Sequence, residues 1–333
     1  MGRQCRIIRT IPFAAVAGVI GIALMWVTAG PAVGASYPAR DVTLISPWAP
    51  GGMATIVAQE ASKAAEKHLG RNIVVKNIPG GAGAIGTTEV MRAKPDGYTL
   101  VLATSGPFAG GPAVAKVLYD PPWKFFEPVV QIGAMPFFLV VKKESPHKTL
   151  NAYIEAAKAK PNTITFGSTG MGSLHHFGME KLQKEAGVKL KHVPFKGASE
   201  LIPALLGGHV DSISTEPMNI PQYLKDGSIR ALCVFNEKRF APYPDVPTAK
   251  ELGFPSVIGG WNGIATPKGA SQEVLSKLIE AYTKGMKEPA FLSAMEKMNY
   301  PVEYLGPKEF GERWVKDYNL VAEMAKAIGI VKQ

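Results

Sequence analysis

Short apolar segments alternate with amphipathic segments along most of the chain, and this alternation constrains the fold most strongly. Residues 42–49 (VTLISPWA) have strand character, residues 53–69 carry apolar side chains at helical spacing, and residues 72–77 are strand-like again. The same order recurs from residue 98 to residue 235. Strands joined through helices form βαβ units, so we predict an α/β fold with mainly parallel sheets and helices on both faces.

The C-terminal third has a different pattern. Residues 271–298 and 307–329 read as long helical stretches on either side of the strand-like segment PVEYLG. Thr248 and Glu251 have the spacing of a capping box and predict a short helix that begins after Thr248. A chain of 333 residues can bury a large core, and its length suggests two domains.

The N-terminus has the three-part layout of a secretory signal peptide. Three arginines precede an uncharged run from Ile11 to Gly30, and small residues follow at Val33 and Ala35. We predict cleavage near Ala35, which makes residues 1–35 a leader and places the rest of the chain outside the cytoplasm. The run is also long enough to span a bilayer, so an uncleaved anchor is the alternative.

Charge and cysteine content narrow the classes of function. Removing residues 1–35 takes away three arginines and no acid, and so lowers the formal charge from +10 to +7. No Lys/Arg run of the kind that binds nucleic acid is present, and we expect no nucleic-acid partner. Cys233 is the one cysteine beyond the leader, so it forms no intramolecular disulfide and no cysteine-built metal site. We interpret it as a small buried hydrophobic residue in a strand.

A glycine-rich segment after residues 72–77 has the G-x-G-x-x-G spacing of a dinucleotide fingerprint at Gly81, Gly83 and Gly86. A dinucleotide site needs an acidic residue at the end of the next strand to hold the ribose, but that strand ends in LATSG. We therefore predict no nucleotide cofactor. The glycines instead suggest a loop that approaches an anion or another loop closely before a helix begins.

Two further strand-to-helix junctions carry the same device. SPWAPGGMAT covers residues 46–55, and GSTGMGSLHH covers residues 167–176. Each offers backbone N–H groups and the positive end of a helix dipole, which favour a carboxylate. One junction in each half of the chain would grip an acid from two sides, whereas plain βα turns would use glycine for conformational reasons alone.

Catalytic and metal motifs are poorly represented. The sequence contains no G-x-S-x-G, no H-E-x-x-H and no P-loop. His176 and Glu180 stand four residues apart and supply only two ligands, fewer than a zinc site needs. We predict that the protein is not an enzyme and holds no metal. A secreted hydrolase or decarboxylase that uses Ser173 with His175 or His176 stays open as an alternative.

Several longer stretches resemble one known family. YPARDVTLISPWAPGG, NIPGGAGAIGTTEVMRAKPDGYTLVLATS, ITFGSTGMGSLHH, HVPFKGASELIPALLGGHVD and RFAPYPDVPTAKELGF resemble the solute-binding receptors of tripartite tricarboxylate transporters, the Bug family. The resemblance covers nearly the whole chain beyond the leader, in family order. It implies a periplasmic binding protein of type II with two α/β lobes that close about a hinge over a small organic carboxylate. It also implies membrane permease subunits as partners, and we expect a monomer.

The resemblance also implies lobe boundaries and ligand contacts. The first lobe would comprise residues 36–135 and 261–333, and the second lobe residues 136–260. The implied ligand-binding residues are Trp48, Ala49, Gly51, Gly52, Met53, Ala54, Thr55, Thr104 and Ser105 in the first lobe, and Ser168, Thr169, Gly170, Ser173, His175, Lys196, Gly197 and Thr215 in the second.

Three positions depart from the family pattern, and one of them is Gln59, where many members have arginine. Thr55 stands where many members have aspartate, which argues against an amino-acid ligand because its ammonium group would lose a partner. Trp48 stands where phenylalanine is usual, and its larger face would either stack on a flat or aromatic acid or pack against the loop. We therefore expect a di- or tricarboxylate or an aromatic acid, handed to a permease or, as an alternative, sensed by a kinase.

Overall fold

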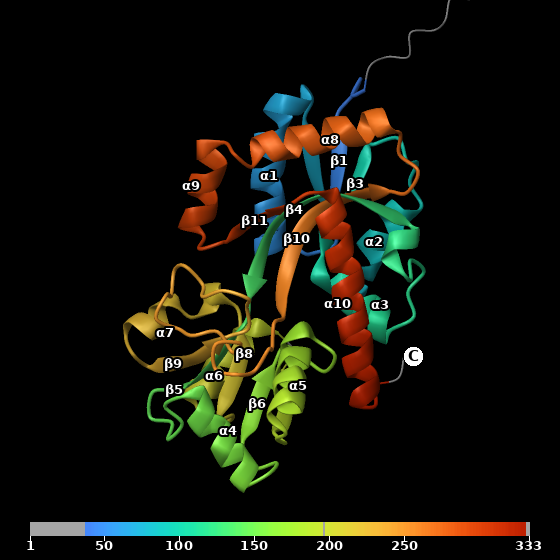
Figure 1. The fold of residues 1–333 in the computed structure, drawn as a ribbon. Coiled ribbons are helices and arrows are strands. Elements are labelled where there is room, and N and C mark those ends of the chain that lie inside the picture. The colour runs from blue at the N-terminus through green and yellow to red at the C-terminus, as the bar shows by residue number, and fades with distance from the viewer. Residues whose placement is uncertain (1–36, 196, 331–333) are drawn as a thin grey trace, which may run out of the picture. The chain divides into compact units, whose positions relative to one another are not determined.

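The computed structural model describes residues 37–195 and 197–330, and these residues form one compact unit. The predicted leader, residues 1–35, and Lys196 lie outside the described residues. Two sheets organise this unit, each with helices against it (Figure 1). The two-lobe α/β fold predicted from the sequence is confirmed.

The first lobe is built on a six-stranded sheet with the order β11-β4-β10-β3-β1-β2. Its central strands are strongly apolar and buried because helices cover both faces. The strands are β1 (Val42–Ser46), β2 (Ile73–Asn77), β3 (Thr99–Thr104), β4 (Phe126–Pro136), β10 (Gly259–Pro267) and β11 (Val302–Leu305).

The second lobe has a five-stranded sheet with the order β7-β6-β8-β5-β9. The chain enters it from β4 and leaves it through β10, and Figure 1 shows these two long strands running down from the first lobe. The strands are β5 (Phe138–Lys142), β6 (Thr165–Ser168), β7 (Lys191–Pro194), β8 (Ser212–Thr215) and β9 (Ile229–Val234).

Helices pack on both faces of each sheet because their apolar stripes match the apolar faces of the strands. In the first lobe, α1 (Met53–Leu69), α8 (Gln272–Gly285) and α9 (Pro289–Lys297) cover one face, and α2 (Ala84–Met91) and α10 (Pro307–Ala327) cover the other. The second lobe carries α4 (Leu150–Ala159) and α5 (Leu174–Ala186) on one face and α6 (Leu201–Leu206) and α7 (Pro221–Lys225) on the other. The remaining helices are short: α3 (Gly111–Val114), η1 (Gly81–Gly83), η2 (Gly106–Gly110), η3 (Pro122–Lys124), η4 (Ala198–Glu200) and η5 (Pro217–Asn219).

The sheets are mixed, whereas the sequence pattern predicted mainly parallel pairing. β1 pairs in parallel with β2 and β3, and β6 pairs in parallel with β7 and β8. The strands near the crossing, β4, β5 and β10, pair antiparallel with their neighbours. These strands carry the chain between the lobes, so their direction follows the crossing and not the βαβ repeat.

Two local predictions in the C-terminal part need correction. The stretch 271–298 forms two helices, because Pro289 cannot continue α8 and instead starts α9. Thr248 and Glu251 make both bonds of a capping box, at 2.8 and 3.0 Å, but the residues after them form turns and no helix. Arg239 Nε also donates to the Glu251 carboxylate, and the chain leaves the turn at Gly253, where φ is +92°.

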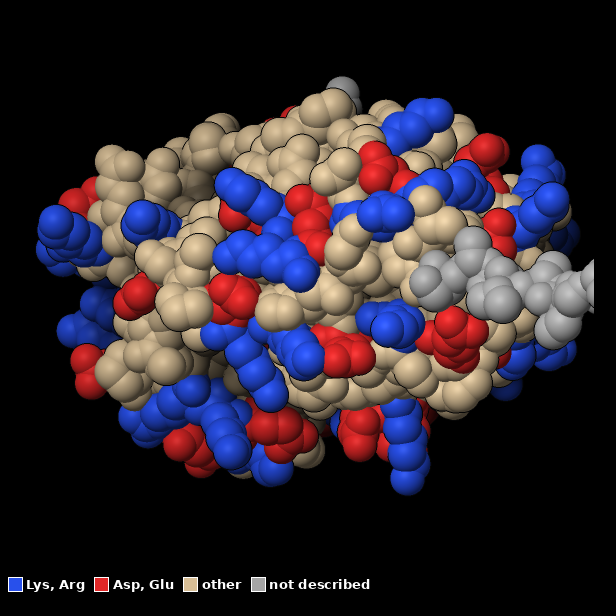
Figure 2. Space-filling model, turned by 90° about the horizontal axis from the view of Figure 1, so that it is seen from above, with Lys and Arg blue, Asp and Glu red and all other residues tan. Residues whose placement is uncertain are grey.

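The surface mixes charges of both signs. Figure 2 shows Lys and Arg side chains interspersed with Asp and Glu over the face seen from above. This pattern is typical of a solvated surface. In residues 37–330, Lys196 aside, no helix is long and apolar enough to cross a membrane.

Candidate functional site

The first strand-to-helix junction predicted to bind a carboxylate, residues 46–55, lies between β1 and α1. Gly52 is the N-cap residue of α1, and its extended backbone leads into the helix without a side-chain cap. The turn is closed by a bond from the Gly52 amide to the Ala49 carbonyl at 3.4 Å. Because no side chain caps the first turn, the amides at the start of α1 are suited to an anion.

The side chain of Thr55 supports this loop from inside. Thr55 is fully buried, and its hydroxyl lies 2.7 Å from Ser46 Oγ and donates to the Ala49 carbonyl at 3.3 Å. Asn77 donates to Thr55 Oγ1 at 3.1 Å and to the Trp48 carbonyl at 2.8 Å. The hydroxyl of Thr55 is therefore engaged within the lobe, and its backbone amide is the group that could meet a ligand. Sequence reasoning missed Asn77, which ends β2.

Trp48 lies against Thr104 at the end of β3, which belongs to the second predicted ligand-binding segment of this lobe. Its indole Nε1 donates to Thr104 Oγ1 at 3.2 Å. A Cβ added at Gly106 would lie 3.6 Å from the Trp48 ring, so the indole covers this turn. Ser105 follows Thr104, and its hydroxyl accepts from the Trp261 amide at 3.4 Å. The structure thus brings the two predicted first-lobe segments together.

The glycine-rich segment forms η1 and the start of α2 and packs against neighbouring loops. A Cβ at Gly83 would lie 2.5 Å from Pro107, and one at Gly86 would lie 2.6 Å from the Ile78 carbonyl and 3.0 Å from Pro47 Cα. Only a residue without a side chain allows these approaches. The prediction of a loop that approaches another loop closely is confirmed, and Pro47 links this segment to the Trp48 loop.

In the second lobe, Ser168 ends β6 and organises the following loop. Its hydroxyl donates to the Gly170 carbonyl at 3.0 Å and lies 2.7 Å from His192 Nε2. Burial lowers the pKa of His192 to about 4, with a smaller contribution from His176. His192 therefore faces Ser168 as a neutral ring at neutral pH.

Ser173 and His176 hold the start of α5. Ser173 is the N-cap residue, and its hydroxyl accepts from the His176 amide at 3.2 Å. His176 Nδ1 accepts from the Gly172 amide at 3.1 Å, its Nε2 lies 3.4 Å from Glu180, and its ring stacks on His192 at 3.9 Å. Burial opposes the charge of Glu180, but its bonds to His176 and Gln183 and the nearby imidazoles outweigh burial and lower its pKa. Ser173 thus acts as a helix cap.

His175 points to a different set of partners. Its Nδ1 lies 3.0 Å from Thr169 Oγ1, its Nε2 lies 3.3 Å from Glu216 Oε1, and its ring stacks on Phe137 at 4.0 Å. The Nε2 atom is buried and makes no well-aligned hydrogen bond, although Glu216 is its close neighbour. Sequence reasoning missed Glu216 and Phe137. Glu216 directly follows Thr215 at the end of β8, and this position could have pointed to it.

Residues at the crossing between the lobes lie next to the predicted ligand-binding residues of both lobes. A Cβ at Gly260 would lie 3.7 Å from Ser105 Oγ and 3.9 Å from the Phe137 ring. Phe137 in turn stacks on His175. Gly260 and Phe137 therefore lie between Ser105 of the first set and His175 of the second.

The remaining predicted residues are placed as follows. Thr215 is fully buried, and its hydroxyl accepts from Asn219 at 3.2 Å. Gly197 precedes η4 in an extended conformation. Lys196 lies outside the described residues, so its predicted contact is not placed.

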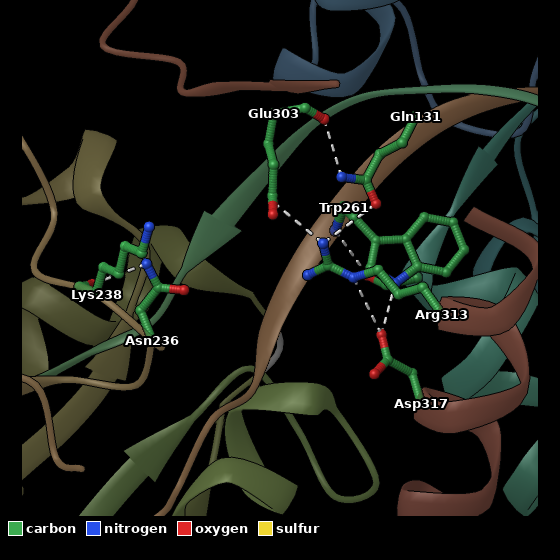
Figure 3. A network of polar contacts seen from close by, with 8 residues as sticks. Gln131, Asn236, Lys238, Trp261, Glu303, Arg313 and Asp317 are labelled. Carbon is green, nitrogen blue, oxygen red and sulfur yellow. Dashed lines mark hydrogen bonds and ion pairs between the residues drawn. The ribbon is translucent and has the colours of Figure 1, made fainter. Parts of the chain in front are cut away.

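Three of the hollows on the described surface have no predicted ligand-binding residue in their lining. The one of about 740 Å³ lies beside the crossing strands, between residues 235–240 and α10. In Figure 3, Asn236 and Lys238 lie on one side of it, and Arg313 and Asp317 lie on the other. The Trp261 indole donates to Asp317 at 2.8 Å, and Arg313 donates to Gln131 at 3.2 Å and to Glu303 at 3.1 Å (Figure 3).

Within residues 37–195 and 197–330, no group of three or more His, Cys, Asp or Glu side chains is arranged to hold a metal ion. Cys233 is fully buried in β9, and burial raises the pKa of its thiol. Its prediction as a buried hydrophobic residue in a strand is confirmed.

Comparisons with known proteins give a consistent result. The sequence profile of the tripartite tricarboxylate transporter family receptor matches residues 57–318. A UPF0065 protein from Cupriavidus necator is 33% identical over 89% of this chain and 90% of its own length. A solute-binding protein of the same receptor family from Polaromonas superposes with a TM-score of 0.79 at 29% identity, over 87% of this chain and 99% of that one.

Two similar structures contain a ligand. An R. palustris protein with adipate has a TM-score of 0.73 at 26% identity, over 89% of this chain and all 100% of that one. MatC from Rhodopseudomonas palustris with bound malate has a TM-score of 0.70 at 27% identity, over 86% of this chain and 99% of that one.

Proposed function

Because the chain belongs to the tripartite tricarboxylate transporter receptor family, we propose that it captures a small organic carboxylate outside the cytoplasm and delivers it to the permease subunits of such a transporter. The two-lobe fold suits this role, since a ligand that contacts both lobes favours the closed arrangement. Release to a permease then requires only that the lobes reopen.

The observation that carries the proposal is the uncapped start of α1. The helix of 17 residues begins at Met53 after Gly52, which has no side chain to satisfy the first-turn amides. These amides and the helix dipole attract an anion, and a ligand carboxylate would satisfy them. We propose the backbone from Trp48 to Thr55, together with Thr104 and Ser105, as the first-lobe half of the site.

The second-lobe half would comprise the loop that starts at Ser168 and the groups beside it. We propose contacts from Ser168, Thr169, Gly170, Ser173, His175, Lys196, Gly197 and Thr215. Thr169 and Gly170 are partly exposed, whereas Ser168, His175 and Thr215 are buried. The buried members would act by holding the loop, and the partly exposed members would meet the ligand.

The ligand class follows from the charge and shape of these groups. Adipate and malate, which occur in two related structures, are both dicarboxylates. A dicarboxylate has an acid group at each end, which matches one glycine-rich strand-to-helix junction in each lobe. Trp48 adds an aromatic face next to Thr104, which would also suit a flat or aromatic acid.

We further propose that residues 1–35 are a signal peptide, cleaved near Ala35, that the receptor works as a periplasmic monomer, and that it is not an enzyme. The first lobe would comprise residues 36–135 and 261–333, and the second residues 136–260. A sensor kinase in place of a permease is the alternative partner, and a pull-down from membranes would distinguish the two.

Thermal unfolding in the presence of matched acids and amides tests the proposal. Malate, adipate and benzoate are compared with their amides malamide, adipamide and benzamide. We expect only the acids to raise the melting temperature of the protein. Binding to the folded state stabilises it by about 2.7 kcal/mol at a ligand concentration of 100 times Kd. Amides carry no charge, so the α1 dipole gains little from them.

Equal stabilisation by an acid and its amide would contradict carboxylate recognition. NMR spectra of the bound acid after long incubation separate a receptor from an enzyme. An unchanged acid supports the receptor, and its conversion supports the hydrolase or decarboxylase alternative.

A further inference from the structure

The carboxyl ends of β1 and β3 lie side by side in the first-lobe sheet, because these two strands pair in parallel. From β1 the chain continues to β2 on one side, and from β3 it continues towards β4 on the other. Connections that leave two neighbouring strands in opposite directions open a crevice at the carboxyl ends of those strands, and open α/β sheets bind their ligands there. A side chain at either strand end is therefore placed to meet a ligand.

Trp48 and Thr104 meet at this crevice. Thr104 is the last residue of β3, and Trp48 follows the end of β1 by two residues. The indole Nε1 of Trp48 donates to Thr104 Oγ1 at 3.2 Å. Asn77 donates to the Trp48 carbonyl at 2.8 Å, and a Cβ at Gly106 would lie 3.6 Å from the ring. These contacts hold the indole so that its N–H points at the Thr104 hydroxyl.

The direction of this hydrogen bond decides what the Thr104 hydroxyl offers to a ligand. An indole N–H can only donate, whereas a hydroxyl has one hydrogen to donate and lone pairs that accept. Thr104 Oγ1 must therefore accept from Trp48, and its own hydrogen points away from the indole. Within residues 37–195 and 197–330, no acceptor binds this hydrogen.

Burial makes the unused hydrogen significant. Thr104 is 5% exposed, so little water reaches it. A buried donor without a partner costs free energy, which an acceptor on a bound ligand would recover. An ionised carboxylate only accepts hydrogen bonds and suits this hydrogen, whereas an ammonium group or the NH₂ end of an amide would oppose it with hydrogens of its own.

We propose that Trp48 is a positioning residue that acts through Thr104: its indole N–H occupies a lone pair of the hydroxyl and so fixes the hydroxyl as a hydrogen-bond donor to a ligand carboxylate. The proposal rests on the proposed function and gives Trp48 a polar role in place of stacking on the ligand. The role depends on the N–H group of Trp48 and on the hydroxyl of Thr104.

The first measurement needs no ligand. ¹H–¹⁵N NMR spectra of the full-length chain follow the indole N–H of Trp48 in the wild type and in two variants. Thr104→Val keeps the shape of the side chain and removes the hydroxyl, and Thr104→Ser keeps the hydroxyl. We expect the indole proton to move upfield in Thr104→Val, where it loses its acceptor, and to stay near its wild-type position in Thr104→Ser. An indole resonance that is unchanged in Thr104→Val would overturn the proposal.

The second measurement is malate affinity by calorimetry. We expect Thr104→Val to bind malate at least about tenfold more weakly, the cost of a lost hydrogen bond to a charged group, and Thr104→Ser to stay close to the wild type. A role of Thr104 in packing alone predicts the opposite order, because valine keeps the volume of threonine and serine loses a methyl group.

Trp48→Phe keeps an aromatic ring and removes the N–H group. We expect it to weaken malate binding about threefold or more in the wild type and in Thr104→Ser, because the hydroxyl is then no longer oriented. In Thr104→Val, where there is no hydroxyl to orient, the same substitution should change the affinity by less than about twofold.

A loss from Trp48→Phe by the same factor in the wild type and in Thr104→Val would mean that the ring acts by packing or stacking, and would overturn the proposal. Unchanged malate affinity in Trp48→Phe would also overturn it. Adipate is titrated in the same way. If neither acid binds the wild type, the proposed function itself fails, whereas binding with losses that do not depend on Thr104 contradicts only the role of Trp48.

Trp123→Phe is the matched control. Trp123 lies in η3 of the first lobe, is partly buried, and packs edge-on against Tyr318 at 5.1 Å. In the described part of the chain, no hydrogen bond joins its side chain to Thr104 or to the Trp48 loop. We expect this variant to keep the wild-type malate affinity and the wild-type position of the Trp48 indole resonance.

Discussion

In the second lobe, the buried contacts of His192 depend on whether its ring carries a proton. Its Nε2 lies 2.7 Å from Ser168 Oγ, and its ring stacks between Phe166 at 4.8 Å and His176 at 3.9 Å. Burial lowers its pKa from 6.5 to about 4. A proton on this ring would place a charge against His176 and disturb the loop that Ser168 supports.

This shift makes stability depend on pH. Between pH 6.5 and about 4 the unfolded chain binds a proton at His192 and the folded chain does not, so the free energy of unfolding falls as pH falls. We expect His192→Gln to lose less stability than the wild type between about pH 7 and pH 5. The difference should be on the order of 1 kcal/mol, because solvent reaches part of the ring. Urea unfolding at both pH values measures it, and parallel curves for the two proteins would contradict it.

At the scale of elements, the glycine-rich turn and α2 determine how the first-lobe loops pack. Gly83 meets Pro107 of η2, and Gly86 meets Pro47, which precedes Trp48. The turn therefore joins β2, η2 and the Trp48 loop into one packed group. The spacing that resembles a dinucleotide fingerprint serves loop packing in this fold.

A methyl group at Gly86 tests this arrangement. A Cβ there would lie 2.6 Å from the Ile78 carbonyl and 3.0 Å from Pro47 Cα, both backbone atoms, so the loop must shift. We expect Gly86→Ala to cost about 1–3 kcal/mol of unfolding free energy and to weaken carboxylate binding through the displaced Trp48 loop. Glu89→Ala on the exposed side of α2 is the control and should stay within about 0.5 kcal/mol. An unchanged Gly86→Ala protein would show that the loop yields without cost.

At the scale of the whole described unit, α10 connects the two lobes. Phe310 and Trp314 in its first half pack with Trp261 in the first-lobe core. Val321 and Met324 in its second half pack in the core of the second lobe, and Glu323 pairs with Lys184 of α5. Figure 1 shows the lower end of α10 beside α5. Any hinge motion must accommodate this helix.

Asp317 lies in the middle of α10 and joins it to the crossing strand β10. Its carboxylate accepts from the Trp261 indole at 2.8 Å and lies 3.6 Å from Arg313 Nε. Burial raises the pKa of Asp317, and the charge of Arg313 opposes this only in part. The folded chain therefore holds this proton more tightly than the unfolded chain, so its contribution to stability is lost as pH rises above 3.8 and through the raised value.

Asp317→Asn removes the titration and keeps an acceptor for Trp261. We expect the stability of the variant, relative to the wild type, to improve as pH rises from about 4 to about 7. Urea unfolding at the two pH values gives both free energies. A relative stability that declines over the same range would show that the pairing with Arg313 dominates over burial.

The sequence by itself determined the elements and the class of fold, because strand and helix periodicity and glycine-rich turns are local properties. It also determined the family and the segments from which a site could be built. The tertiary structure decided what lies far apart in the chain yet close in space. It paired Thr55 with Asn77, Trp48 with Thr104, and His175 with Glu216. It made the sheets mixed, since strand direction follows the crossing between lobes, and it left the Thr248–Glu251 capping bonds without a helix. Such outcomes depend on packing between segments that are distant in the chain, and local sequence patterns contain no information about that packing.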